Sequence, residues 1–447
     1  MASLAAPALA AAARKPNIVF ISSDDHHFQA LGAAGNPNIK TPHLDRLASR
    51  GANFVNGQIS TPQCAPSRGV LLTGRETFQT GLVSNGQTSF REGTPTVVGD
   101  LKKAGYQTTV IGKWHIRNSP AECGFAEAPL WLRAGGSMYR DPALCRGLDG
   151  EPGEVPGHIT DLFTDAAISS IRGTKQPHFL WLAYNAPHTP WFADDRYQLP
   201  YRGKETASLA PPLHPAGGKP FDWNTYYAVI THLDEAIGRL CAEFDRRKAW
   251  NDTYVFFIGD NGFMCGTRGI NGKVVPWEES VRVPMIAAGG RIAKGTRPDC
   301  PAASIDLPAT WLDLAGAQPS EPVFGRSLRG VLETGKGGPA EGFSVWDDGL
   351  PSALAVKQAV EPYRQVRTRT HKLTLFESGR QEAYSHAADF AETKNLVNDG
   401  ASTAVVDDLR SRLRARMTAT ADHAADWWTR KPGSPPAQRK GSRKKQA

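Results

Sequence analysis

Four short apolar runs, each followed at once by a cluster of polar residues, most constrain the fold of this 447-residue chain. They are rich in β-branched and aromatic residues. The runs cover residues 16–23, 106–111, 178–184 and 254–258. Such runs predict strands buried on both faces, as in a parallel sheet. Helix-like segments lie between them, at residues 45–50, 97–104, 159–172 and 223–247. Alternating strands and helices predict a doubly wound, mostly parallel α/β sheet.

The polar clusters all follow the expected strands, and this placement predicts one shared site. In chain order they read D-D-H-H, G-K-W-H, N-A-P-H and G-D-N-G. In doubly wound sheets, ligands bind beyond the carboxyl ends of the strands. Four separate elements are therefore expected to bring their side chains to one edge of the sheet.

The composition and the apolar pattern of the chain change after Gly316, and this change predicts a smaller C-terminal subdomain. Pro and Gly are frequent from 317 to 340. Alternating segments at 363–368 and 371–376 predict an antiparallel sheet, and 404–425 predicts a final helix. The expected division is an Ala-rich leader at 1–15, a catalytic domain at 16–330, a C-terminal α+β subdomain at 331–430 and a basic disordered tail at 431–447.

The net charge of +8 does not predict nucleic-acid binding, because it is mostly an end effect. Residues 431–447 contain six basic residues and no acidic residue, so the rest of the chain carries +2. A solvated tail explains this segment more simply than a specific anionic partner does. No run of about 18 apolar residues occurs, so no membrane span is predicted.

The cysteines and the N-terminus bear on the cellular compartment. The six cysteines include no C-x-x-C pair, which argues against a zinc site. Cys123 and Cys145 could pair if the compartment is oxidising. The leader contains A-x-A triplets but lacks a basic start, so we expect the back half of an export signal. A periplasmic or secreted protein is therefore expected, with a cytoplasmic protein as the alternative.

The most specific motif is the string C-A-P-S-R-G-V-L-L-T-G-R at residues 64–75. Taken by residue type alone, it is a loop cysteine before a helix start, with Ser67 as a candidate cap. The whole string resembles the type I sulfatase signature C-x-P-S-R-x-x-x-L-T-G-R, with no position missing. The resemblance implies the alkaline-phosphatase-like fold and oxidation of Cys64 to formylglycine by a formylglycine-generating enzyme. Its hydrated aldehyde carries two hydroxyls, of which one attacks sulfur and the other then expels sulfate.

Asp24, Asp25, Asp260 and Asn261 form an all-oxygen set that suits Ca²⁺ or Mg²⁺ rather than zinc. Each pair alone is more often a turn or a helix cap. In the sulfatases that this chain resembles, the matching residues hold calcium. The resemblance therefore implies a Ca²⁺ site, or Mg²⁺ in its place, that also includes the residue derived from Cys64.

Two further segments resemble sulfatase motifs and carry histidines. G-K-W-H at residues 112–115 implies that Lys113 contacts both the aldehyde hydrate and the sulfate. It also implies that His115 takes a proton when sulfate leaves, and a reference pKa of about 6.5 suits this role. Alone, His115 is equally well a core histidine. The P-H-x-P segment implies that His188 binds sulfate and protonates the leaving oxygen.

Three basic residues complete the implied site. By the resemblance, Arg68 binds and orients the hydrate, and Lys273 holds the sulfate. The segment around Lys273 departs from the family at Arg268, where many members have histidine. This departure leaves the details of the substrate pocket open, and the core chemistry is unaffected.

These residues predict a sulfuric ester hydrolase that acts on a sulfated carbohydrate, favoured over aryl or choline sulfate by base rate. One alternative is a phosphonate or phosphate ester hydrolase, because relatives with the same motif catalyse that reaction. Another is a sulfated-glycan binding protein with unmodified Cys64. Four tryptophans are expected in loops where they could stack on sugars, although packing is the commoner role. They are Trp131, Trp191, Trp223 and Trp277.

Overall fold

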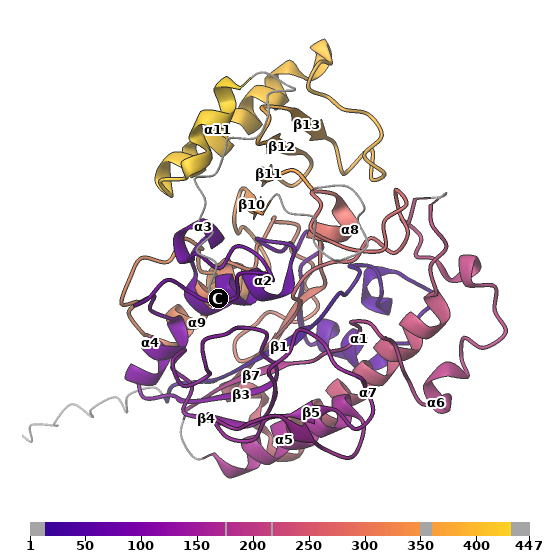
Figure 1. Cartoon of the computed structure of the whole chain (residues 1–447), viewed down its shortest axis with the longest axis vertical. Helices are drawn as coiled ribbons and strands as arrows, with labels where there is room; N and C mark the ends of the chain where they lie inside the picture. Colours follow the sequence, from indigo (N-terminus) through magenta and orange to yellow (C-terminus); the bar gives the residue numbers. More distant parts are fainter. Residues whose placement is uncertain (1–13, 175–176, 216–217, 349–359, 431–447) are drawn as a thin grey trace, which may run out of the picture.

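A seven-stranded sheet forms the centre of the computed structural model, which describes residues 14–174, 177–215, 218–348 and 360–430. The strand order is β2-β9-β8-β1-β7-β3-β4 (Figure 1). The strands are β1 (Asn17–Ser23), β2 (Gly51–Asn53), β3 (Gln107–Lys113), β4 (Glu127–Leu132), β7 (His178–Ala183), β8 (Thr253–Gly259) and β9 (Met285–Gly289). From β8 to β4 the neighbours are parallel, whereas β9 and β2 pair antiparallel at one edge. The predicted mostly parallel sheet is confirmed, and the sequence analysis missed β2, β4 and β9.

Helices cover both faces of this sheet (Figure 1). On one face lie α1 (Pro42–Ser49), α5 (Ile159–Gly173) and α7 (Trp223–Arg247), packed on a core that includes Val19 and Ile21. On the other face lie α2 (Cys64–Thr73), α4 (Val97–Lys103), α9 (Asp306–Ala315) and α10 (Arg329–Thr334), packed on a core that includes Ile18 and Phe20. Successive residues of β1 thus enter opposite cores, as a strand buried on both faces requires.

The C-terminal part of the chain forms a second, antiparallel sheet, and the segment after its first strand contacts α3 (Thr77–Thr80) through Asp347 and Thr77 (Figure 1). Its strands are β10 (Gly342–Trp346), β11 (Tyr363–Arg367), β12 (Lys372–Phe376) and β13 (Gln381–Tyr384). The helix α11 (Thr403–Ala419) packs on this sheet. The predicted C-terminal sheet and helix are confirmed. The helix ends earlier than residue 425, because Ala421 adopts a left-handed φ of 50°.

The proposed domain division stays a prediction. The helix α10 spans residue 330, and its Val331 and Leu332 belong to the core beneath the large sheet. The tail at 431–447 and nearly all of the leader lie outside the described residues. Besides short 3-10 helices, the remaining elements are α3 (Thr77–Thr80), β5 (Ala143–Leu144), β6 (Gly153–Glu154), α6 (Asp195–Gln198) and α8 (Glu278–Val281).

The cysteines are all free in the structure. Cys123 and Cys145, the pair considered for a disulfide, are buried as separate thiols in the core beneath α4 and α9. Within the described ranges, none of the helices combines the length and the apolar character that a membrane crossing needs.

Candidate active site

The polar residues that follow β1 and β8 meet at the carboxyl edge of the sheet. The two strands pair in parallel up to Ser23, and the Asp260 amide donates to the Ser23 carbonyl at 2.8 Å. Asn261 Nδ2 donates to Asp25 Oδ1 at 2.6 Å. Asp24 lies beside them, and all four side chains are buried. The structure therefore brings together the four residues that the sequence grouped as oxygen donors.

Cys64 is the first residue of α2 and does not lie in a loop. The helix begins before Pro66, because the first turn of a helix tolerates proline, whose missing N–H has no intrahelical partner. Ser67 is consequently a buried helix residue, and the expectation that it caps the helix is wrong. Cys64 and Arg68 are four residues apart, so they share one face of the helix.

The end of the 64–75 string holds the helix in place. Gly74 closes α2 with a φ of 65°, and its amide donates to the Val70 carbonyl at 2.8 Å. A Cβ at this position would lie 2.8 Å from Cγ1 of Val323. Arg75 extends away and pairs with Glu321 at 3.0 Å. The string therefore combines Cys64 and Arg68 in the first turns of the helix with a glycine at its end.

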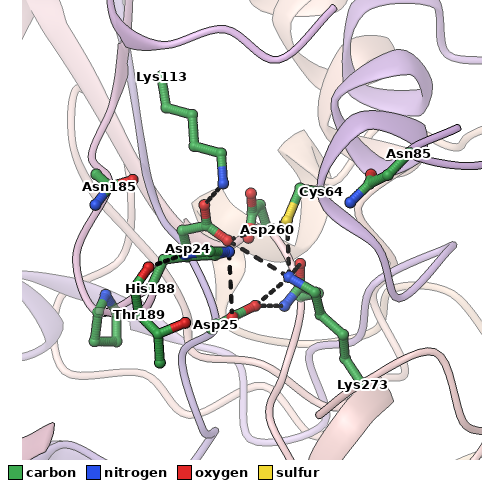
Figure 2. Close-up of polar contacts among 12 residues, drawn as sticks. Asp24, Asp25, Cys64, Asn85, Lys113, Asn185, His188, Thr189, Asp260 and Lys273 are labelled. Atoms are coloured by element: carbon green, nitrogen blue, oxygen red, sulfur yellow. Dashed lines mark hydrogen bonds and ion pairs between the residues drawn. The ribbon is translucent and has the colours of Figure 1, made fainter. Parts of the chain in front are cut away.

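Two lysines reach the acidic cluster from opposite sides (Figure 2). Lys113 Nζ contacts Asp24, and Lys273 Nζ contacts Asp25. Lys273 Nζ also lies 2.8 Å from Cys64 Sγ. The sulfur in turn lies 3.3 Å from Asp24 Oδ1. The thiol is thus enclosed between a carboxylate and an ammonium group.

Arg68 completes the charge balance. Its Nη2 donates to Asp260 Oδ2 at 2.7 Å, and its Nη1 donates to the Lys113 carbonyl at 2.5 Å. With the two lysines, it gives three cations against the three carboxylates, all of them buried. Breaking a buried pair costs about 3–5 kcal/mol, because one charge is left uncompensated. The cluster must therefore assemble as a unit.

Burial and neighbouring charges shift the pKa values of the cluster. Burial alone would raise the pKa of Asp24, but Lys113 and the other cations hold it well below its ordinary value. Burial and the charge of Asp24 raise the pKa of Asp260 to about 7. The same two causes raise the pKa of the Cys64 thiol to about 12. The encoded cysteine therefore carries a protonated thiol at neutral pH.

His188, which follows β7, faces the cluster. Its Nε2 lies 3.9 Å from Asp25 Oδ2. One ligand atom each from Asp24, Cys64 and His188 lies within 4.8 Å of the other two. Burial and the charge of Lys113 lower the pKa of His188. The ring is therefore neutral at pH 7 in this arrangement.

His115, which follows β3, stands two residues after Lys113. Its backbone is left-handed, with a φ of 60°, and Asp25 has a φ of 62°. Left-handed non-glycine residues are costly and cluster at functional sites. Burial and the charge of Lys113 lower the pKa of His115 to about 2. Its Nδ1 has no hydrogen-bond partner among the described residues, so packing orients the ring.

Family comparison agrees with this geometry. The family model named Sulfatase matches residues 16–317. The chain belongs to the sulfatase family. A second model, N-sulphoglucosamine sulphohydrolase, C-terminal, matches residues 266–419. The protein is therefore a sulfuric ester hydrolase of the alkaline-phosphatase-like superfamily, as the 64–75 string indicated.

The matches to individual relatives extend over nearly the whole chain of this sulfatase. An ulvan-active sulfatase of Formosa agariphila is 28% identical over 444 residues, which cover 93% of this chain and 84% of the relative. A solved structure of a protein in complex with its substrate D-glucosamine-2-N,6-O-disulfate has a TM-score of 0.81 at 24% identity, over 92% of this chain and 99% of that one. A phosphonate monoester hydrolase of Agrobacterium radiobacter has a TM-score of 0.72 at 20% identity, over 91% and 96%. Both structures share the fold of this chain.

Motif analysis missed two residues that support the cluster in this sulfatase. The Tyr226 hydroxyl, from α7, donates to the Asp25 carbonyl at 2.6 Å and accepts from the His27 amide at 2.9 Å. Asn85 Oδ1 accepts from the Ala65 amide at 3.1 Å, in the first turn of α2. Neither residue lies in a recognisable motif, so only the assembled fold reveals them.

Arg268 points away from the acidic cluster. Its Nη2 donates to the carbonyls of Ala391 and Glu392 at 3.0 and 2.9 Å. Its guanidinium lies 4.5 Å from the centre of the Trp277 ring. The residue that departs from the family pattern therefore links the loop after β8 to the C-terminal subdomain.

Two of the four tryptophans expected in sugar-binding loops are core residues. Trp131 lies in β4 and Trp223 begins α7, and both are 3% exposed. The loop prediction is wrong for them, because β4 was not recognised and because the apolar face of α7 extends to its first residue. Trp191 is half-buried, and its Nε1 donates to the Pro187 carbonyl at 2.6 Å. It supports the loop that carries His188.

We expect Tyr226→Phe to lower both stability and turnover of 4-nitrophenyl sulfate. The change leaves the buried Asp25 carbonyl and His27 amide unpaired, which costs about 1–3 kcal/mol. Asp25 then loses a contact that holds its left-handed backbone. Urea unfolding and kcat measure the two effects. Tyr227→Phe is the matched control: its hydroxyl accepts from Asn36 Nδ2 at 2.8 Å, so it should lose stability and keep kcat. Equal losses of kcat in both variants would contradict this role.

Proposed function

We propose that this sulfatase releases sulfate from a sulfated carbohydrate, using formylglycine at position 64 and a bound Ca²⁺, or Mg²⁺ in its place. The observation that carries the proposal is the position of Cys64 Sγ, 2.8 Å from Lys273 Nζ and 3.3 Å from Asp24 Oδ1. A reacting group on this residue lies beside the fixed ammonium group of Lys273, and such a positive charge stabilises the charge that develops on a sulfuryl group.

The oxygen donors fit a hard divalent cation. Lys273 Nζ contacts Asp25, and it lies 3.2 Å from Asn261 Oδ1 and 3.8 Å from Asp24 Oδ1, so three donors converge on one positive charge. Asp260 Oδ1 is buried without a hydrogen-bond partner among the described residues. Such a donor set suits Ca²⁺ or Mg²⁺. Bound by these four residues and by the residue derived from Cys64, the cation would supply positive charge to the sulfate oxygens.

Formylglycine would supply a geminal diol, with one hydroxyl for attack on sulfur and a second for release of sulfate. Cys64 is 1% exposed and starts a fully buried helix. A formylglycine-generating enzyme must therefore act on this residue before the chain has folded.

The cationic side chains of the cluster are suited to hold the sulfate group. Lys113 and Lys273 approach the aspartates from opposite sides, and Lys273 Nζ also lies 2.8 Å from Cys64 Sγ (Figure 2). Arg68 lies on the same helix face as Cys64 and is fixed by Asp260 at 2.7 Å. We assign sulfate binding to the two lysines and orientation of the residue at position 64 to Arg68.

The two histidines are suited to transfer protons in two different steps of the reaction. His188 would protonate the departing alkoxide, and His115 would take a proton when sulfate is released. A bound sulfate ester brings negative charge beside His188. This charge opposes the effect of burial, so it raises the pKa of the His188 ring. The protonated form of the ring is then favoured.

Two relatives support the proposed substrate class. One is named for its action on ulvan, and one structurally similar protein has a sulfated glucosamine as its substrate. The second candidate is a phosphonate or phosphate ester hydrolase, favoured by the shared fold of a phosphonate monoester hydrolase. Turnover of matched sulfate, phosphate and phosphonate esters distinguishes them. We expect the highest kcat/KM with the sulfate ester, and a higher value with a phosphonate would favour the second candidate.

The modification at position 64 has a direct test. We expect the peptide that contains residue 64 to react with an aldehyde-specific hydrazide after co-expression with a formylglycine-generating enzyme. Cys64→Ala should lose both labelling and turnover. Cys241→Ala, at a cysteine of α7, is the control and should keep both. Full turnover by Cys64→Ala would end the formylglycine proposal. A parent protein with neither labelling nor turnover would instead favour the binding-protein alternative, to be tested with sulfated glycans.

The metal site has an independent binding test. We expect Ca²⁺ at a hundredfold excess over its Kd to stabilise the chelated enzyme by about 2.7 kcal/mol. Asp260→Ala should weaken Ca²⁺ binding in calorimetry and lower turnover, because it removes one oxygen donor. Asp252→Ala, at an exposed position before β8, should bind Ca²⁺ like the parent enzyme. Undiminished turnover after exhaustive chelation, with no divalent cation in elemental analysis, would contradict the site.

The histidine roles predict different dependences on the leaving group. His188→Ala should slow a sugar sulfate by about 10²–10⁴-fold, the usual loss for a general acid. It should slow 4-nitrophenyl sulfate far less, because nitrophenolate leaves without a proton. His115→Ala acts after the alcohol has left, so it should slow both substrates equally. Equal losses on both substrates for His188→Ala would show that the roles are wrongly assigned.

A further inference from the structure

The segment that follows β4 passes over both candidate histidines. Gly135 lies against the ring of His115, and Gly136 lies against the ring of His188. The two histidines follow different strands, so this segment links two parts of the site. We propose that Gly135 and Gly136 are positioning residues that set the two imidazole rings, a role that rests on the proposed function of these histidines.

Close approach, and not backbone conformation, requires glycine here. Neither Gly135 nor Gly136 has the left-handed φ that only glycine adopts readily. A Cβ on Gly135 would lie 2.5 Å from Cε1 of His115, inside any normal contact distance. A Cβ on Gly136 would lie 3.2 Å from Cε1 of His188, which a small shift relieves. The first glycine is therefore the stricter requirement.

The segment is anchored at both ends, so it cannot move aside easily. At its start, the Trp114 amide donates to the Leu132 carbonyl at 2.8 Å. At its end, the buried Tyr139 hydroxyl donates to the His188 carbonyl at 2.8 Å. The Ile159 amide donates to the Tyr139 carbonyl, also at 2.8 Å. A methyl group added to Gly135 must therefore displace the ring of His115, because the backbone of residue 135 cannot move away.

The two rings differ in what else holds them. His188 Nδ1 contacts the Thr189 carbonyl at 2.6 Å, and its Nε2 faces Asp25 at 3.9 Å. His115 Nδ1 has no hydrogen-bond partner among the described residues. The ring of His115 thus depends on packing against Gly135, whereas the ring of His188 keeps its own polar partners. We expect Gly135→Ala to be the more damaging change.

The test compares both alanine variants with a matched control in the mature, full-length enzyme. Gly135→Ala should reproduce His115→Ala, with equal losses on sugar sulfate and 4-nitrophenyl sulfate of about 10²-fold, as for a misplaced catalytic group. Gly136→Ala should show a smaller loss that is greater on the sugar sulfate. Gly153→Ala, whose Cβ would meet no atom within 4 Å, should match the parent enzyme.

A double-mutant cycle separates positioning from a general structural defect. Once His115→Ala has removed the ring, Gly135→Ala should cause no further loss. It should also be tolerated structurally, because the ring that the methyl group would strike is gone. If Gly135→Ala alone does not fold, a folded double variant still supports the proposal. Additive losses, parent-like turnover of Gly135→Ala, or a double variant that does not fold would overturn it.

NMR of histidine-labelled enzyme supplies a readout independent of turnover. The resonances of His115 and His188 are assigned by their absence in the respective alanine variants. Gly135→Ala should move the His115 resonance and leave that of His188 in place, and an unmoved His115 resonance would overturn the proposal. If the single histidine variants show no difference between leaving groups while this shift occurs, the assigned proton roles fail and the positioning role stands.

Discussion

The rest of the structure depends on enclosing three carboxylates and three cations in one buried cluster at the carboxyl edge of the sheet. An isolated buried charge costs several kcal/mol, so each group is tolerated only with its partners. The cations come from separate elements: Arg68 from α2, Lys113 from the end of β3 and Lys273 from the loop after β8. The sheet register, the start of α2 and that loop must therefore form together.

The fold could be predicted where periodicity and strand ends determine it. The four apolar runs became β1, β3, β7 and β8, which are neighbours in the sheet, so the polar residues after them converge. The strands that were missed are short or lie toward the edges. In β4, exposed and buried residues alternate at the start, which hides a strand from a search for continuous apolar runs. Trp131 was assigned to a loop for that reason.

The site could be predicted only for residues whose side-chain chemistry stands in a motif. Tyr226 is 201 residues from Asp25 and acts through a backbone carbonyl, so nothing near it in the sequence marks its role. Gly135 and Gly136 also lie outside every motif, because glycine has no side-chain chemistry that a motif could mark. Their importance is the space that they leave for the histidine rings, which exists only once β3, β4 and β7 are side by side.

The C-terminal subdomain supports the active site directly, through the loop that carries Lys273. Gln365 Nε2 and Lys372 Nζ donate to the Pro276 carbonyl at 2.8 and 2.9 Å. Arg367 pairs with Glu278 at 2.9 Å, and both side chains are buried. Two family models overlap on this loop, one ending at residue 317 and the other beginning at residue 266. The C-terminal sheet therefore holds the end of the loop that carries Lys273, the cation that contacts Cys64.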